Sequence, residues 1–347
     1  MTPMTYQPLA YDLNPRPFPQ LVSIVIAAFN EEETIPALRA AVTAFSNALP
    51  AAVEIVIVND GSVDGTFQLL AAWARADYRI KVVNLARNFG HQAAATAGLD
   101  CASGDAVVLM DADLQDPPDV INAMIAEYCR GYDVVYGRRV SRLGETAFKR
   151  LTAWTFYRVM RLLTRADLPV DTGDFRLISK QCLEQLSRMR ETHRFLRGMV
   201  AWVGFPQTAV PYERQPRAAG TTKYPLLAML RFAWTAAVSF SPAPLRLSFA
   251  FGVLLALIGT TQAVNAVVRT ALGLYTVPGW TSLMVVVWLV GGAILISIGV
   301  VGEYVARIFE EVKGRPLYIV GSSINLPQAR EDRDENRPRS SAAVHVH

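Results

Sequence analysis

The sequence predicts an α/β protein with a mostly parallel, Rossmann-like sheet, accompanied by interfacial amphipathic helices and followed by two C-terminal transmembrane helices. Short runs rich in β-branched residues alternate with helical stretches in the first half of the chain, a pattern typical of βαβ units. Two later runs of about 22 residues carry no charged side chain and are long enough to cross a bilayer. Of the 347 residues, 52% are hydrophobic and 18% are charged, which is more apolar than one soluble domain usually is.

The first twenty residues contain five prolines and no apolar core of signal-peptide length, so we expect an unstructured arm over residues 1–20 and no secretory signal. An α/β domain is expected over residues 21–224. Its strands are predicted at residues 21–27, 53–58, 80–85, 106–110 and 133–136. Because ligands of such sheets bind beyond the carboxyl ends of the strands, functional residues are expected in the loops that follow them.

The two charge-free runs are residues 247–268 and 281–302. Two buried helices of a large soluble core are the alternative, but the length of both runs favours two membrane spans. Basic residues flank the pair on its outer sides, whereas the connecting loop holds only Arg269. Since basic residues are enriched in cytoplasmic flanks, we expect both flanks and the preceding domain to lie in the cytoplasm.

Further segments are interpreted from their charge and periodicity. Residues 138–165 hold eight Arg or Lys side chains against one Glu, and about 145–165 is expected to form an interfacial helix with its apolar side in lipid. A basic helix packed on protein and solvated on one side is the alternative. Residues 225–246 are a juxtamembrane candidate, residues 303–326 a cytoplasmic return segment, and residues 327–347 a disordered tail.

The composition argues against several classes of protein. The net charge of +4 is low and the basicity is local, so nucleic acid is not an expected partner. The three cysteines are widely separated and lack the spacing of zinc ligands or of a disulfide framework. Neither a G-x-G-x-x-G after the first strand nor a P-loop motif is present, and the two spans hold no ionisable residue, which disfavours a transporter.

Two carboxylates end the fourth expected strand. Asp111 and Asp113 flank one small residue there, and carboxylates with open coordination suit Mg²⁺ or Mn²⁺. An Asp-X-Asp alone is a weak signal, because capping and turn roles are common. Here Leu-Gln-Asp-Pro-Pro follows, with prolines placed to open the next helix, and the pattern therefore points more specifically to a divalent metal site.

Polar loops follow the first two expected strands. The first reads Ala-Phe-Asn-Glu-Glu over residues 28–32, and the second begins Asn-Asp-Gly-Ser over residues 59–62. Turn and capping chemistry explains each loop taken alone. Because both lie at one edge of one sheet, together they form a polar rim suited to a base and a ribose.

These loops and three further motifs resemble the inverting GT-A-fold polyprenyl-phosphate glycosyltransferases, the group of dolichyl-phosphate mannose synthase and the bactoprenol (undecaprenyl-phosphate) glucosyltransferases. The similarity runs from about residue 21 to about residue 318. The five motifs occur in the expected order at residues 28–32, 59–62, 87–90, 111–118 and 217–224. Residues 171–177 and 194–198 look most like the bactoprenol glucosyltransferase branch.

The resemblance implies roles for the residues of the rim. Asp60, together with the loop of Ala28, Asn30 and Glu32, would hold the nucleotide base and ribose. Asp111 would lie near the ribose and the diphosphate. This edge of the sheet would therefore bind a nucleotide sugar.

The resemblance also implies a metal set and a closing loop. Asp113 and Gln115, with Asp111, would meet the metal, and Arg87 and His91 complete the expected donor-binding residues. For His91, capping a helix and approaching a phosphate are equally open.

Arg217 and Lys223 would come from a mobile loop that closes over the diphosphate and neutralises its charge. A basic juxtamembrane linker is the alternative for this segment. Both cations would then lie near the membrane without touching the donor.

The implied acceptor is a lipid monophosphate, whose second pKa of roughly 6 leaves its oxygen anionic at neutral pH, so that positioning and electrostatics are the main tasks. Arg138, with Arg139, would draw the lipid phosphate to the side opposite the leaving group, and attack from there inverts the anomeric centre. Asp174 would grip sugar hydroxyls or orient a cation. A buried Asp174 paired to Arg176 or Arg138 is the alternative.

The resemblance thus implies a hexosyltransferase in the bacterial inner membrane that moves one hexose from UDP-glucose to undecaprenyl phosphate for cell-envelope glycans such as lipopolysaccharide. It also implies a homo-oligomer, a tetramer in this family. GDP-mannose, a UDP-N-acetylhexosamine and a UDP-aminoarabinose-type donor are the alternatives in the same class. A non-catalytic nucleotide-sugar-binding anchor or a flippase subunit is the alternative from another class.

Overall fold

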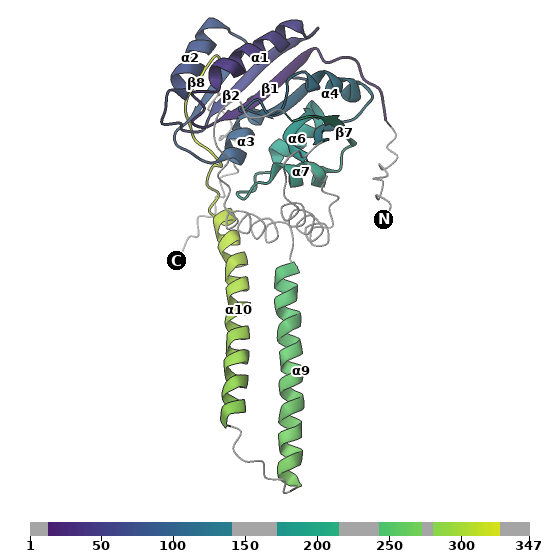
Figure 1. The fold of residues 1–347 in the computed structure, drawn as a ribbon, viewed down its shortest axis with the longest axis vertical. Helices are drawn as coiled ribbons and strands as arrows, with labels where there is room; N and C mark the ends of the chain where they lie inside the picture. Colours follow the sequence, from purple (N-terminus) through teal and green to yellow (C-terminus); the bar gives the residue numbers. More distant parts are fainter. Residues whose placement is uncertain (1–12, 141–171, 215–242, 273–279, 327–347) are drawn as a thin grey trace, which may run out of the picture.

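The computed structural model of the chain describes residues 13–140, 172–214, 243–272 and 280–326. It consists of an α/β domain from which two long helices extend side by side (Figure 1). The interfacial helix expected at about 145–165 and the disordered tail expected at 327–347 lie outside the described residues. So does the juxtamembrane helix expected at 225–246, apart from its last four residues.

The domain is built on one eight-stranded sheet with the order β7-β5-β6-β4-β1-β2-β3-β8. Its central strands β4, β1, β2 and β3 are parallel, and β5 and β7 are parallel to each other. β6 runs antiparallel to both β4 and β5, and β8 runs antiparallel to β3. The strands are Leu21–Ala28 (β1), Ala52–Asn59 (β2), Ile80–Leu85 (β3), Ala106–Asp111 (β4), Val134–Arg139 (β5), Thr172–Ser179 (β6), Gln207–Tyr212 (β7) and Val320–Ile324 (β8). A mostly parallel sheet is confirmed, and all five predicted strands are present.

Helices cover both faces of the sheet because residues along each strand alternate between two apolar clusters. On β1, Ile24 and Ile26 join the cluster that contains the buried residues of α1, α2 and α4, while Val25 joins the cluster of α3, α6 and α7. Trp73 of α2 is the largest fully buried side chain. The helices are Ile35–Ala48 (α1), Thr66–Ala76 (α2), His91–Cys101 (α3), Val120–Cys129 (α4), Lys180–Arg188 (α6) and Leu196–Val203 (α7).

The N-terminal segment packs against the domain. The Arg16 guanidinium lies 3.0 Å from the Asp133 carboxylate, and the Arg16 N–H donates to the carbonyl of Cys129. Arg16 also lies over the ring of Tyr128. The prediction of an unstructured arm over residues 1–20 is therefore wrong for residues 13–20. The Arg16 side chain in this segment binds the buried carboxylate of Asp133 and lies over the ring of Tyr128.

The two long helices are Ala243–Ala271 (α9) and Trp280–Val312 (α10). Within the described residues, one segment, Val290–Val312 of α10, is by length and composition apolar enough to cross a membrane, and it is 6% buried. The apolar part of α9, Ser248–Thr261, is shorter than such a span. Of the two spans predicted at 247–268 and 281–302, the second is thus supported, since it lies within α10 and overlaps Val290–Val312.

The return segment predicted at residues 303–326 contains the end of α10 and an edge strand of the sheet. Strand β8 leads back from α10 and pairs with β3 (Figure 1). Next to it, the Asn325 amide donates to the carbonyls of Ala74 and Ile80, at 2.7 and 2.9 Å. Residues after the long helices therefore complete the domain, which extends beyond the predicted limit of residue 224.

Candidate active site

The loops after β1 and β2 are fastened to each other by hydrogen bonds. The Asn30 N–H donates to Ser62 Oγ at 2.9 Å, and the Val63 N–H donates to Asn30 Oδ1 at 2.9 Å. The Gly65 N–H donates to Glu32 Oε2 at 2.8 Å. The structure thus brings the two predicted rim loops together, and the side chains of Asn30 and Glu32 shape the rim.

Asp60 ties the rim to the loop after β3. Both of its carboxylate oxygens accept backbone N–H groups there, from Phe89 at 2.7 Å and from Gly90 at 2.9 Å. Its own N–H donates to the carbonyl of Ala28, the last residue of β1. The carboxylate is buried, and this burial raises the pKa of Asp60. In this structure Asp60 orients the third loop.

Gly61 lets the second and third loops approach closely. Its φ is +65°, and a Cβ there would lie 2.5 Å from the Asn88 nitrogen, so only glycine fits without a shift of the backbone. Beyond the contact, the Arg87 guanidinium lies 4.3 Å from the centre of the Phe89 ring. Arg87 is exposed, so a cation is held at the surface of the third loop.

Asp111 ends β4, and the chain turns sharply after it. Leu114 has a φ of +55°, and the Gln115 N–H donates to Asp113 Oδ1 at 3.1 Å. Burial raises the pKa of Asp111 to about 6, and the nearby carboxylates, including those of Asp113 and Asp174, add to this effect. Negative charge is therefore crowded at the end of β4.

This crowding of negative charge suits a bound divalent cation. Among the described residues, no group of three His, Cys, Asp or Glu side chains forms a candidate metal site. Magnesium is often bound through only one or two carboxylates, with substrate phosphates and water as the other ligands. The oxygen donors of Asp111, Asp113 and Gln115 therefore fit such an ion, and their metal role stays a prediction.

Next to Asp111, a charged cluster joins α3, β6 and α7. His91, the first residue of α3, places Nε2 3.6 Å from Asp111 Oδ1 and 3.3 Å from Asp174 Oδ2. Arg197 Nε lies 2.7 Å from Asp174 Oδ1. Although burial alone would raise the pKa of Asp174, His91 and Arg197 hold it well below its usual range, and the hydrogen bond raises the pKa of His91. His91 thus bridges two carboxylates, and the helix cap is Gly90.

Asp174 is a buried carboxylate paired with cations, as one of the two interpretations of the sequence expected. The buried Arg176 lies 3.8 Å from it and donates to the carbonyls of Asp174 and Gly173, while burial lowers the pKa of Arg176 to about 10. The shortest pairing is with Arg197, which was not predicted. The motif at residues 194–198, noted for its resemblance alone, was the signal that could have found it.

At the end of β5, two consecutive arginines differ in their surroundings. Arg138, the predicted phosphate ligand, is exposed, whereas Arg139 is half-buried and donates from Nε to the Tyr212 hydroxyl at 3.3 Å. Tyr212 in turn donates to the buried carboxylate of Asp116. No role was predicted from the sequence for Tyr212 or for the carboxylate of Asp116.

Two of the candidate residues predicted from the sequence, Arg217 and Lys223, lie outside the described residues.

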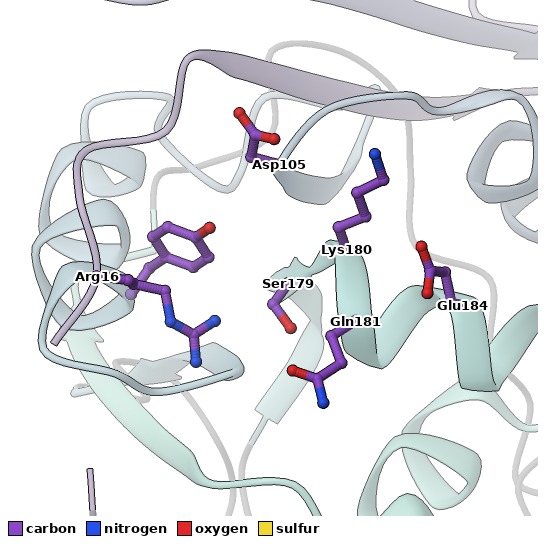
Figure 2. Close-up of a pocket in the computed structure, with 7 residues that line it drawn as sticks. Arg16, Asp105, Ser179, Lys180, Gln181 and Glu184 are labelled. Atoms are coloured by element: carbon purple, nitrogen blue, oxygen red, sulfur yellow. The ribbon is translucent and has the colours of Figure 1, made fainter. Parts of the chain in front are cut away.

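The domain also contains a pocket at some distance from the candidate site. The pocket in Figure 2 lies at the opposite end of the strands, because it is lined by Asp105, directly before β4, whereas Asp111 ends that strand. Six residues of strand span about 20 Å. The pocket is therefore separate from the candidate site.

Comparisons with known proteins identify the family of the chain. The family model "Glycosyl transferase family 2" matches residues 23–187. The uncharacterized glycosyltransferase YkcC of Bacillus subtilis is 42% identical over 314 residues, covering 90% of this chain and 97% of that protein. The bactoprenol glucosyl transferase of Shigella phage SfII is 38% identical over 302 residues, covering 87% of this chain and 98% of that protein.

Among solved structures, the mannosyltransferase PcManGT from Pyrobaculum calidifontis, in complex with GDP-Man and Mn²⁺, is 18% identical with a TM-score of 0.42, covering 84% of this chain and 90% of that chain. The assignment of the family rests on the sequence relatives. Their identity of about 40% extends over nearly the full length of both proteins. This chain belongs to glycosyl transferase family 2, and it is a glycosyltransferase enzyme.

Proposed function

We propose that this enzyme transfers one glucose from UDP-glucose to undecaprenyl phosphate on the cytoplasmic face of a bacterial inner membrane, giving a lipid-linked sugar for cell-envelope glycans. One observation carries the proposal. The similarity to bactoprenol glucosyl transferases covers 86–87% of this chain and 97–99% of those proteins, so it includes both long helices as well as the α/β domain. A nucleotide-sugar site together with helices of this length suits a lipid acceptor.

In this proposal the loops after β1, β2 and β3 bind the nucleotide. The hydrogen bonds of Asn30, Glu32 and Asp60 hold the three loops in one fixed rim. The pocket for the base and the ribose is therefore preformed, which favours binding of the nucleotide. Arg87 is exposed on the third of these loops, where it would neutralise phosphate charge. Arg217 and Lys223 remain predicted to close over the diphosphate.

Asp113, Gln115 and Asp111 would hold Mg²⁺ or Mn²⁺, which when bound stabilises negative charge on the departing nucleotide diphosphate. The remaining work falls to positioning. His91, held between Asp111 and Asp174, keeps both carboxylates in place beside the expected sugar position. The acceptor phosphate is already anionic, so it needs no general base, and direct attack inverts the anomeric centre.

We further propose that α9 and α10 both cross the membrane as a hairpin. At 29 and 33 residues, each helix exceeds the roughly 20 residues that a span requires, and the two pack side by side. In the chain β7 precedes α9 and β8 follows α10, so a hairpin of two spans supports a single cytoplasmic location for the α/β domain and for β8. The tetramer expected from the family resemblance stays a proposal.

The test is lipid-linked transfer in membranes that contain the protein. Labelled UDP-glucose, UDP-GlcNAc and GDP-mannose are each supplied with undecaprenyl phosphate, and label is followed into solvent-extractable lipid. We expect label from UDP-glucose alone, loss of transfer with a chelator, and recovery with Mg²⁺ or Mn²⁺. Asp113→Ala should abolish transfer, whereas Asp119→Ala, at an exposed carboxylate on the same loop, should not.

Other outcomes would change the proposal in different ways. Label from GDP-mannose or UDP-GlcNAc would change the identity of the donor but leave the type of reaction unchanged. Donor binding without any transfer would support a nucleotide-sugar-binding anchor instead. Full activity of Asp113→Ala would exclude the metal role of that carboxylate.

A further inference from the structure

Three side chains at the carboxyl end of the sheet form a directional chain of hydrogen bonds. Arg139 Nε donates to the Tyr212 hydroxyl at 3.3 Å, and the hydroxyl donates to Asp116 Oδ1. A guanidinium can only donate and a carboxylate can only accept, so the tyrosine hydroxyl must accept from one side and donate to the other. The chain therefore has a single direction, from Arg139 to Asp116.

Packing fixes the middle of this chain. Arg139 and Tyr212 are register partners at the ends of β5 and β7. Phe175 packs edge-on against the Tyr212 ring at 5.7 Å between centroids, and a Cβ on Gly137 would lie 2.8 Å from that ring. Because glycine leaves room for the ring across the strand, the hydroxyl is held in one place.

The far end of the chain is a buried carboxylate. Asp116 is 1% exposed and Tyr212 is 5% exposed. Among the described residues, Asp116 Oδ2 is buried and has no hydrogen-bond partner. Burying a carboxylate in this way is costly unless cations lie near it, and Arg139 and Arg214 both contribute favourable charge. A position kept at such a cost calls for a role beyond packing.

The near end of the chain lies at the same edge of the sheet as Asp111, because β4 and β5 both run antiparallel to β6. Arg139 Nη2 lies 2.9 Å from the place where a Cβ on Gly173 would stand, on the face of β6 that also carries Phe175. The hydrogen bond to Tyr212 engages Nε, and Nη2 of the planar guanidinium lies toward Gly173 of β6. Arg139 thus presents a fixed cation at the same edge of the sheet as the candidate site at Asp111.

We propose that Asp116 and Tyr212 are positioning residues that hold the Arg139 guanidinium at the carboxyl edge of the sheet so that it binds a phosphate group of a substrate. The inference rests on the proposed function for the identity of the substrates. Two sources of phosphate are available in that reaction, the acceptor lipid and the donor diphosphate. Separate measurements for the two substrates distinguish them.

The first test removes one hydroxyl. Tyr212→Phe is expected to raise KM about tenfold for one substrate, the one whose phosphate meets Arg139, with a smaller change in kcat. Tyr128→Phe is the matched control, since Tyr128 is 8% exposed, also lies near an arginine, and stands at the opposite end of the domain. If Tyr212→Phe has the same KM as the wild type for each of the two substrates, the proposal is overturned.

The second test asks whether Tyr212 acts through Arg139. In an Arg139→Ala background, Tyr212→Phe is expected to change KM no further, because the group that it positions is gone. A further increase of the same size would mean that Tyr212 acts independently, and would overturn the proposal. Asp116→Asn keeps an acceptor oxygen and should raise KM less than Asp116→Ala does. This comparison of the two Asp116 variants replaces the test if Tyr212→Phe does not fold.

Wild-type transfer is measured first, so that failure of the proposed function is seen separately. If the wild type transfers no sugar, equilibrium binding of polyprenyl monophosphate in nanodiscs and of UDP-glucose replaces KM as the readout. The proposal then predicts that Tyr212→Phe weakens binding of one of the two about tenfold and that Tyr128→Phe does not. Unchanged binding of both ligands would overturn it.

Discussion

Arg197 and Asp174 are joined by a contact of 2.7 Å between Nε and Oδ1, which fixes the start of α7 to the start of β6. The other carboxylate oxygen of Asp174 faces His91. Asp174 is therefore a buried, charged group whose two oxygens are oriented by different elements. Its position relative to Asp111 depends on Arg197 as much as on the strand that carries it.

Replacing Arg197 should therefore damage the site. Arg197→Ala is expected to lower the stability of the folded domain by about 2 kcal/mol, because it leaves a buried carboxylate with less compensation. Transfer should fall at least about tenfold. Thermal unfolding in detergent and the lipid-transfer assay measure the two effects. Arg130→Ala, which breaks an exposed pair with Glu127, is the control and should change neither.

Gly61 provides a test of the close approach between the second and third loops. Gly61→Ala should destabilise the protein by about 1–3 kcal/mol and raise KM for the nucleotide sugar, because the new Cβ meets the backbone of residues 87–88. Gly314→Ala is the matched control. Gly314 also has a positive φ, +58°, but a Cβ there meets nothing within 4 Å, so only the conformational cost should appear. Equal effects of the two variants would contradict the clash.

Glu54 predicts a dependence of stability on pH that is independent of the candidate site. Burial alone would raise its pKa, but hydrogen bonds from Lys81, Ser23 and Ser103 lower it below the ordinary value. A carboxylate with a lowered pKa stabilises the folded state above its ordinary pKa, and this contribution is lost as the pH falls through the folded-state pKa. Stability should therefore be retained near neutrality and fall in acid.

Glu54→Gln should remove that part of the acid sensitivity. The variant is expected to be less stable than the wild type at pH 7, by about 2 kcal/mol, with the difference shrinking as the pH drops below about 4. Thermal unfolding measured from pH 7 to pH 3 gives both curves. Glu184→Gln, at an exposed carboxylate, serves as the control, and a constant gap between wild type and Glu54→Gln would refute the assignment.

Asn325 tests the attachment of β8. Asn325→Asp keeps the shape of the side chain but removes the amide group that donates to Ala74 and Ile80, so stability should fall by about 2 kcal/mol. Thermal unfolding gives the change. Asn47→Asp is the control, since Asn47 Oδ1 accepts a hydrogen bond from Arg79 and an aspartate oxygen can accept it equally. No difference between the two variants would show that the amide bonds are unimportant.

The first five strands could be predicted because each contains at least two consecutive β-branched residues, which are buried on both faces of the sheet. The last three could not, because their sequences are weaker and their pairing is not local. The β6 run Thr172–Ser179 contains charged residues and pairs antiparallel between β4 and β5. The β8 run Val320–Ile324 is short and mostly exposed, and it pairs with a strand more than two hundred residues earlier in the chain.

The same distinction holds for the candidate site. The position of Asp60, Asp111 and Asp113 at the carboxyl ends of strands follows from the βαβ pattern. The bridge from His91 to Asp174 does not, since it depends on how α3 and β6 meet. Nor does the choice between Arg138 and Arg139, because neighbouring residues on a strand face opposite sides and the sequence alone did not show which side faces Tyr212.

Strand β8 also imposes an order on the biosynthesis of the protein. It is encoded after both long helices, yet it occupies the sheet edge next to β3. A nascent chain that has emerged only as far as β7 still has an open edge at β3, with unpaired backbone groups. Translation must proceed beyond α10 before β8 can pair with that edge. The loop of Arg87, whose neighbour Ala86 donates its N–H to Ile319, therefore acquires its final support only after the hydrophobic hairpin has left the ribosome.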